Sequence, residues 1–263
     1  MGTELSRRGF LATMAASYPL LRGTEMCAAP AKRPNIILIM ADDMGFSDIG
    51  CYGGEISTPN LDGLAKKGIR FTQFYNTPRC CPSRATLLTG LYCHQAGVGH
   101  MVEDYGVPGY RGFLNDRCVT IAEALKPAGY TTLMVGKWHV GEQRPHWPVD
   151  RGFDHYYGLV SGGSNYWKVD KGRIFAVDGE QTTPTDKGFY VTDAFSTKAV
   201  GYVDTHGRGD KPFFLYLAYT APHWPLHAWP DDIAKYKGKY LKGWDKLREE
   251  RHKRQIEMGI VDP

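Results

Sequence analysis

The sequence predicts an α/β fold with a mainly parallel sheet, because apolar strand-like runs alternate with helical patterns along the chain. The runs Asn35–Ala41 (NIILIMA) and Phe213–Tyr219 (FFLYLAY) are apolar throughout and rich in β-branched or aromatic residues. Such runs are typical of strands buried on both faces of a parallel sheet. Helical spacing of apolar residues recurs between the two runs.

The remaining elements are predicted from periodicity and from the residues that favour helix ends. Proline suits the first turn of a helix, and glycine commonly ends one. We therefore expect helices that start at Thr58-Pro59, at Pro82 and at Ile121 and that end near Gly68, Gly90–Leu91 and Gly129. We also expect strands over Ile69–Tyr75 and Thr131–Val135, a helix over Val191–Val203 and a charged helical stretch over Trp244–Met258. The region from about 141 to 190, rich in Gly, Asp, Tyr and Trp, is expected to form long loops over the sheet.

Composition places the chain among ordinary globular proteins. It has 263 residues, of which 42% are hydrophobic and 23% charged, with a net charge of +4. This length allows a sizeable core. The mild positive charge, without a basic tract or a known motif, argues against a nucleic-acid partner. The six cysteines form no C-x-x-C pairs, and adjacent Cys80 and Cys81 have poor geometry for a disulfide with each other.

The N-terminus has the pattern of a twin-arginine signal peptide. Arg7-Arg8 is followed by the apolar stretch Phe10–Leu21 and by small residues at Cys27-Ala28-Ala29. The order of these features predicts a signal peptide over residues 1–29, a folded portion over 30–263, and a periplasmic or secreted location reached through the twin-arginine translocase. The apolar stretch is too short for a stable membrane anchor. The alternative is a cytosolic protein with an accidental arginine pair.

Two adjacent carboxylates, Asp42 and Asp43, follow the first predicted strand directly. Ligands of open α/β sheets bind beyond the carboxyl ends of strands. Neighbouring carboxylates repel each other unless positive charge lies between them, and their oxygens suit calcium or magnesium. A metal site and a solvated turn with a capping aspartate are both open on this pattern.

The segment Cys80-Cys81-Pro82-Ser83-Arg84 starts a predicted helix, with Cys80 expected just before the helix N-terminus. That end carries partial positive charge and free N–H groups, which favour anions and thiolates. Arg84 can offer a fork of donors to a tetrahedral oxyanion. The alternative is a pair of small buried cysteines at a helix start.

Two further polar clusters follow predicted strands. In Gly136–Gly141 (GKWHVG), alternation places Lys137 and His139 on one side of an extended chain, which suits an anionic leaving group or a general acid. His223 lies in Ala221–Pro225 (APHWP), just after the last apolar strand. Each cluster could alternatively be structural, but all these polar groups fall at strand carboxyl ends or at a helix start.

With these residues in view, the chain resembles the sulfatase family, and bacterial arylsulfatases in particular. The central signature C-x-P-S-R, followed by x-x-L-L-T-G, is complete from Cys80 to Gly90, and the resemblance extends from Arg33 to the end. The first cysteine of the signature lies two positions before the proline. The modified residue is therefore expected to be Cys80, with Cys81 at the variable position.

The resemblance implies an alkaline-phosphatase-like fold and a sulfuric ester hydrolase. Cys80 would be oxidised to formylglycine by a maturation enzyme. One hydroxyl of the hydrated aldehyde would attack sulfur, and the second would expel sulfate. Asp42 and Asp43, together with the modified Cys80, would bind calcium in preference to magnesium. Arg84 would orient the formylglycine hydrate, Lys137 would bind sulfate, His139 would support the formylglycine, and His223 would contact sulfate and assist the leaving group.

The sequence departs from the family pattern after His223. Sulfatases carry a later Asp-Asn pair that completes the metal site and another lysine that contacts sulfate, and neither is found here. The chain is therefore expected to be the N-terminal portion of a longer enzyme. The alternatives are a phosphatase or phosphodiesterase of the same superfamily, or an inactive truncated fragment. The substrate class is expected to be aryl or glycan sulfates, and the loop Ser161–Trp167 is predicted to line the substrate pocket.

Overall fold

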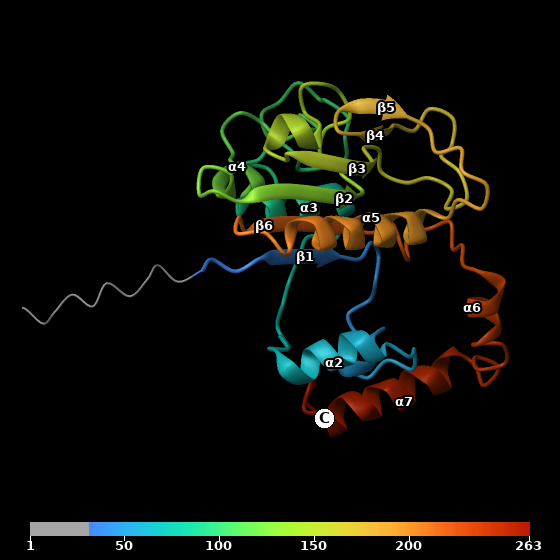
Figure 1. The fold of residues 1–263 in the computed structure, drawn as a ribbon. Helices are drawn as coiled ribbons and strands as arrows, with labels where there is room; N and C mark the ends of the chain where they lie inside the picture. Colours follow the sequence, from blue (N-terminus) through green and yellow to red (C-terminus); the bar gives the residue numbers. More distant parts are fainter. Residues whose placement is uncertain (1–31) are drawn as a thin grey trace, which may run out of the picture. The chain divides into compact units, whose positions relative to one another are not determined.

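The computed structural model describes residues 32–263, and at their centre lies a six-stranded sheet (Figure 1). The strands run in the order β1-β6-β2-β3-β4-β5. In this spatial order, β1, β6, β2 and β3 are parallel to one another, whereas the pairs β3–β4 and β4–β5 are antiparallel. The predicted mainly parallel α/β fold is therefore confirmed. Their bounds are β1 Ile36–Met40, β2 Thr131–Gly136, β3 His155–Leu159, β4 Phe175–Val177, β5 Glu180–Thr182 and β6 Phe213–Ala218. The predicted signal peptide lies outside the described residues.

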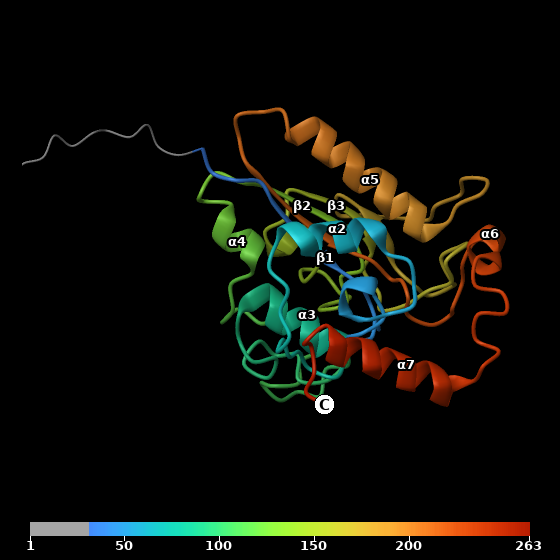
Figure 2. The same ribbon diagram turned by 90° about the horizontal axis from the view of Figure 1, so that it is seen from below.

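Alternation along the two central strands divides the core into two layers. In β6, Phe214 and Tyr216 point into one apolar cluster, and Phe213 and Leu215 point into the other. Successive side chains of a strand face opposite sides, so a fully apolar strand supplies both clusters. Helix α5 (Val191–His206) covers one face, while α3 (Cys80–Thr89) and α4 (Ile121–Leu125) cover the other (Figures 1 and 2).

The predicted helices are confirmed, with small shifts at their ends. The helix expected after Thr58 is α2 (Pro59–Lys67), and the charged C-terminal stretch is α7 (Trp244–Glu257). Helix α3 begins at Cys80, two residues earlier than predicted from Pro82, so Cys80 lies inside the first turn and not before it. The structure adds α6 (Pro230–Ala234) and two 3-10 turns, Gly50–Tyr52 and Pro148–Arg151.

Two predictions of secondary structure are wrong. Residues 69–75 form no strand, and Ile69 and Tyr75 are more than four-fifths exposed. Alternation alone does not make a strand without a neighbouring strand to share its hydrogen bonds. The region 141–190 is not all loop, because it contains β3, β4 and β5. Strand β3 (HYYGL) is stabilised by its parallel pairing with β2. Its histidine and glycine interrupt the apolar pattern of a buried strand, so the sequence alone does not indicate this pairing.

Strand β1 differs from the expectation that both of its faces are buried. It pairs with β6 alone among the described strands. Ile36, Leu38 and Met40 pack against the core, whereas Ile37 and Ile39 are 47% and 54% exposed. The apolar sequence of β1 therefore predicts the strand correctly but not its place at the edge.

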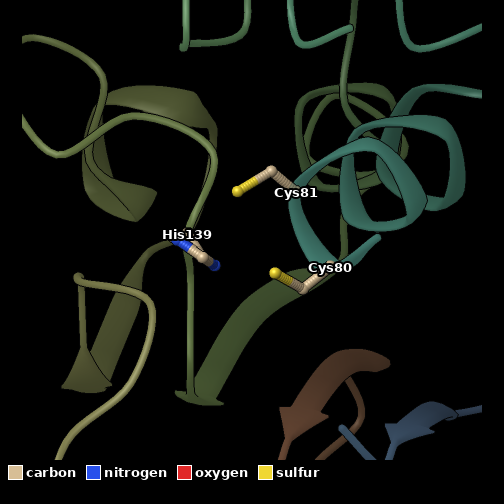
Figure 3. Close-up of side chains that lie close together, drawn as sticks. All are labelled: Cys80, Cys81 and His139. Atoms are coloured by element: carbon tan, nitrogen blue, oxygen red, sulfur yellow. The ribbon is translucent and has the colours of Figure 1, made fainter. Parts of the chain in front are cut away.

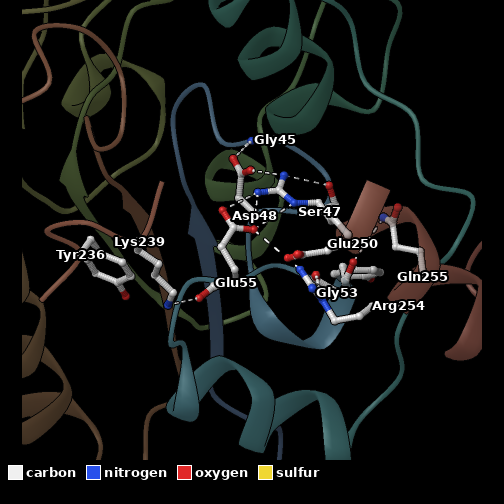
Figure 4. Close-up of polar contacts among 12 residues, drawn as sticks. Gly45, Ser47, Asp48, Gly53, Glu55, Tyr236, Lys239, Glu250, Arg254 and Gln255 are labelled. Atoms are coloured by element: carbon white, nitrogen blue, oxygen red, sulfur yellow. Dashed lines mark hydrogen bonds and ion pairs between the residues drawn. The ribbon is translucent and has the colours of Figure 1, made fainter. Parts of the chain in front are cut away.

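Helix α7 is tied to the segment that follows β1 by a network of ion pairs (Figure 4). Arg251 donates to both carboxylate oxygens of Glu55 and lies 3.1 Å from Asp48. Arg254 donates to the carbonyl oxygen of Gly53, and Lys239 donates to that of Glu55. The network joins residues about 200 positions apart and fixes the path of the chain beyond Asp42 and Asp43.

We expect the substitution Arg251→Gln to lower the free energy of unfolding by about 1–2 kcal/mol near pH 7, because the Glu55 side chain is only 12% exposed. Burial acts to raise the pKa of Glu55, but hydrogen bonds from Arg251 outweigh it and hold this pKa below its ordinary 4.5. The stabilisation is complete above pH 4.5 and disappears as the pH falls through the lower folded-state value. Urea unfolding of both proteins from pH 7 to pH 3 checks this, and a pH-independent difference would contradict it.

Two properties of the described chain bear on its chemistry. The five cysteines among these residues are all free thiols. No helix within residues 32–263 is both long and apolar enough to cross a bilayer.

Candidate active site

The residues predicted to carry chemistry meet at the carboxyl ends of three adjacent strands. Asp42 follows β1, Lys137 and His139 follow β2, and His223 follows β6. Backbone hydrogen bonds fix two of these loops, from the N–H of Asp42 to the carbonyl of Ala221 and from the N–H of Lys137 to that of Ala218. The N-terminus of α3 brings Cys80 and Arg84 to the same edge, which is the usual ligand-binding edge of an open α/β sheet.

Asp42 lies in a buried cluster with two cations. Its carboxylate accepts a hydrogen bond from Lys137 Nζ at 2.5 Å and lies 3.3 Å from Arg84 Nη2. Arg84 Nη1 also donates to the carbonyl oxygen of Lys137 at 2.8 Å. The side chains of Arg84 and Lys137 are fully buried, and that of Asp42 is 4% exposed. One carboxylate therefore balances only one of the two buried positive charges.

The charge of Arg84 is maintained by its neighbours. Burial acts to lower its pKa, but Tyr216 and then Asp42 outweigh burial and raise the pKa above the ordinary value. The Tyr216 hydroxyl lies 3.4 Å from Arg84 Nη1. A net positive potential at this edge favours anions such as sulfate esters and thiolates.

Cys80, Cys81 and His139 form a second cluster next to the first (Figure 3). Hydrogen bonding with Cys81 lowers the pKa of the Cys80 thiol, burial opposes it, and hydrogen bonding with His139 lowers it further. The contact with Cys80 and then burial raise the pKa of Cys81. Burial lowers the pKa of His139 despite its contact with Cys80. Cys80 is half-buried, whereas Cys81 is fully buried in the core beneath it.

The backbone at this edge is held in uncommon conformations. Asp43 and His139 both have a φ of +59°, and Asp178 is the third non-glycine residue with positive φ in the described chain. Such conformations cost on the order of 1–3 kcal/mol each and gather at functional sites. Gly162 lies against the ring of His139, because a Cβ atom added there would be 2.3 Å from His139 Nε2.

We expect the substitution Gly162→Ala to displace the His139 ring and to reduce any catalytic turnover that depends on this ring at least about tenfold, because small displacements at a reacting centre are costly. Gly163→Ala is the matched control, because its added Cβ would lie no closer than 3.5 Å to any neighbour. Steady-state kinetics on both variants check this. Equal activity of the two would show that His139 has room to move.

Asp43 and His223 lie on the more open side of the site. Asp43 Oδ2 is 3.6 Å from His223 Nε2, and the side chains are 62% and 29% exposed. The Tyr166 hydroxyl lies 2.7 Å from the carbonyl oxygen of His223 and 3.0 Å from that of Thr220. Tyr166 thereby positions the loop that carries His223, a role that no local pattern around Tyr166 indicates.

A cavity of about 410 Å³ opens between these groups. Cys80, His139 and His223 line it, so three predicted site residues share one space. Lys137 and Arg84 do not line it, because both are fully buried against Asp42. Part of the loop Ser161–Trp167 forms its wall, as the sequence predicts. The wall also includes residues that the sequence did not single out: Met101, Asp170, Arg173 and His227. No spacing signal marks these four, because the fold gathers them from three separate segments, with Asp170 and Arg173 in one turn.

The acidic pair supplies suitable donors for a hard cation but too few of them. Calcium takes six to eight oxygen ligands. Asp42 already pairs with Lys137 and Arg84, and Asp43 contacts His223. No third carboxylate of residues 32–263 joins them in a potential metal-binding group. The described residues therefore do not complete a calcium site.

Comparison with known proteins identifies the family. The Sulfatase family model matches residues 34–262. The chain belongs to the sulfatase family. Its similarity to the arylsulfatase of Klebsiella aerogenes is 39% identity over 259 residues, covering 94% of this chain and 55% of that protein. This sulfatase chain spans about half the length of the curated relatives it matches.

Solved structures support the fold assignment. Ps i-CgsB in complex with k-i-k-neocarrahexaose has a TM-score of 0.70 and 35% identity, covering 87% of this chain and 53% of that one. BT4656 in complex with D-glucosamine-2-N,6-O-disulfate has a TM-score of 0.63 and 32% identity, covering 80% and 39%. The predicted sulfatase-type α/β fold is confirmed.

Proposed function

We propose that this protein is a hydrolase that cleaves sulfate esters, with residue 80 as the nucleophile after conversion of Cys80 to formylglycine. The observation that carries the proposal is the position of Cys80 at the first turn of α3, in contact with His139 and facing the cavity. Buried Lys137 and Arg84 interact electrostatically with Cys80 and contribute positive charge near it, which suits a sulfate group. The complete C-x-P-S-R signature within a sulfatase-family chain supports the same nucleophile.

The hydrated aldehyde of formylglycine would supply one hydroxyl for attack on sulfur and a second that allows sulfate to leave. The residues of this chain would then divide the remaining tasks. Lys137 and Arg84 stabilise negative charge that grows on the sulfate oxygens. His139 holds and orients residue 80 through their contact. His223 also lines the cavity, and it would give a proton to the leaving oxygen.

We propose that Asp42 and Asp43 contribute to a calcium site in the full-length enzyme, with the modified residue 80 as a further ligand. Carboxylate oxygens are the donors that calcium prefers. Their two side chains account for a minority of the ligands required. Calorimetric titration of the full-length enzyme with calcium and with magnesium tests this proposal, and calcium binding that persists in an Asp43→Asn variant would contradict it.

The substrate class we propose is aryl or glycan sulfates. The cavity of about 410 Å³ is in the size range of small-molecule sites, and its wall carries charged and hydrogen-bonding groups from Asn165, Asp170 and Arg173. Two proteins with similar folds are seen in complex with a neocarrahexaose and with a disulfated glucosamine. These complexes support a sugar-sized sulfated ligand for this site.

Paired substrates test the proposed reaction. The full-length enzyme, co-expressed with a formylglycine-generating maturation enzyme, is expected to hydrolyse an aryl sulfate with turnover and to leave the matching aryl phosphate essentially uncleaved. Faster cleavage of the phosphate would favour the phosphatase or phosphodiesterase alternative. Inactivity on a panel of aryl and glycan sulfates, despite conversion of Cys80, would favour the alternative that the protein is catalytically inactive.

We propose export through the twin-arginine translocase to the periplasm or beyond, supported by Arg7-Arg8 and the apolar stretch after it. This route moves folded proteins, so Cys80 could be converted before export. Changing Arg7 and Arg8 to lysine is expected to retain the protein in the cytoplasm, as cell fractionation would reveal. Unchanged export of that variant would contradict the proposed route.

A further inference from the structure

The chain as synthesised, with thiols at both positions 80 and 81, holds three soft donor groups close together. The ligand atoms of Cys80, Cys81 and His139 all lie within 4.8 Å of one another (Figure 3). No other group of three His, Cys, Asp or Glu side chains within residues 32–263 is gathered in this way. The three residues come from two fixed elements, the first turn of α3 and the segment directly after β2.

The geometry of this trio is close to that of a zinc site. In tetrahedral zinc sites, Zn–S bonds of about 2.3 Å place two sulfur atoms about 3.8 Å apart. The three ligand atoms lie within 4.8 Å of one another. A shift on the order of 1 Å would bring them to the spacing of a zinc site. His139 is 5% exposed, and its Nδ1 atom is buried without a hydrogen-bond partner among the described residues. The imidazole therefore keeps bonding capacity that the protein does not use.

The charges around the trio also permit a metal ion. Two thiolates and one divalent cation sum to zero, so binding adds no net charge to the buried cluster of Asp42, Arg84 and Lys137. Thiolate and imidazole ligands select zinc-like cations, whereas the carboxylates of Asp42 and Asp43 suit calcium. Cys80 and His139 line the cavity, which leaves a fourth coordination position open to water.

We propose that, before Cys80 is converted, Cys80, Cys81 and His139 bind one thiolate-preferring divalent cation of the zinc type. Binding forms two metal–sulfur bonds and one metal–nitrogen bond and releases one proton from each thiol. The site belongs to the unconverted chain alone, because formylglycine has no sulfur. It shares position 80 with the calcium site proposed above but forms only before conversion and uses Cys81 and His139 in place of Asp42 and Asp43. It also goes beyond the sulfatase reaction, which requires the converted residue.

Cobalt(II) titration of the unconverted full chain tests this site, with conversion excluded by the mass of the Cys80 peptide. We expect one Co²⁺ per chain, with thiolate-to-cobalt charge-transfer absorption and tetrahedral d–d bands that one equivalent of Zn²⁺ abolishes. Cys81→Ser and His139→Ala should each weaken binding at least about 100-fold. Cys93→Ser should leave binding unchanged, because Cys93 is buried beside a histidine, His94, without a third donor.

Alkylation of the wild-type chain provides a measurement that does not depend on variants. We expect Zn²⁺ to slow iodoacetamide modification of Cys80 at least tenfold and a chelator to restore the original rate. The absence of charge-transfer absorption in the folded chain would overturn the proposal. So would an alkylation rate that Zn²⁺ does not change, or an unaltered cobalt spectrum in a folded Cys81→Ser variant.

Discussion

Replacing Cys80 with alanine is expected to abolish the proposed sulfatase activity, with a loss of at least about 10⁴-fold in kcat, as is common when a nucleophile is removed. The residue faces the cavity beside His139, and alanine offers neither a thiol for maturation nor a hydroxyl for attack. Hydrolysis of an aryl sulfate by the purified variant, measured against the wild type, checks this.

Cys81→Ala is the matched control. Cys81 is fully buried, and its sulfur contacts that of Met101 at 3.8 Å in the core beneath the site. We expect a stability cost of about 1 kcal/mol and retention of most of the activity. Equal losses in the two variants would mean that the assignment of the nucleophile between these adjacent cysteines is wrong.

The substitution Asp42→Asn is expected to lower the free energy of unfolding of this chain by about 3–5 kcal/mol, because it leaves buried charges without their counterion. Lys137 and Arg84 are both fully buried, and Asp42 is the only carboxylate that forms an ion pair with either of them in the described chain. Asparagine preserves the shape of the side chain but not its charge. Urea unfolding at neutral pH measures the loss.

The neighbouring substitution Asp43→Asn separates this effect from a general response to losing a carboxylate. The Asp43 side chain is 62% exposed, and asparagine tolerates the left-handed backbone found there. We expect a change within about 0.5 kcal/mol. A similar loss for both variants would show that the buried ion cluster does not govern stability.

The parts of the fold that the sequence predicts well are those with strong local patterns. The apolar runs around Ile36–Met40 and Phe213–Ala218 identify two strands, and proline and glycine identify the ends of α2. Sheet neighbours and strand edges depend on contacts between distant residues. For this reason local patterns predict loop for β3, strand for Ile69–Tyr75 and two buried faces for β1, and all three predictions are wrong.

The same distinction between local patterns and long-range contacts applies to the candidate site. Each predicted residue stands directly after a strand or at a helix start, so position along the chain was enough to find Asp42, Cys80, Lys137, His139 and His223. The contacts among these residues cannot be predicted from the sequence, because they join distant parts of the chain. Lys137 was expected to bind sulfate, and the structure shows it fully buried against Asp42. Tyr166 and Arg173 reach the site from loops, where no periodicity indicates which side chains face inward.

The mass of the peptide that carries Cys80 and Cys81 tests the central claim most directly. After co-expression with a formylglycine-generating enzyme, conversion removes one sulfur and two hydrogens and adds one oxygen, a decrease of about 18 mass units from the thiol. Fragmentation is expected to place this decrease at position 80 and to leave Cys81 unchanged. An unmodified thiol at position 80, or a decrease located at position 81, would contradict the account.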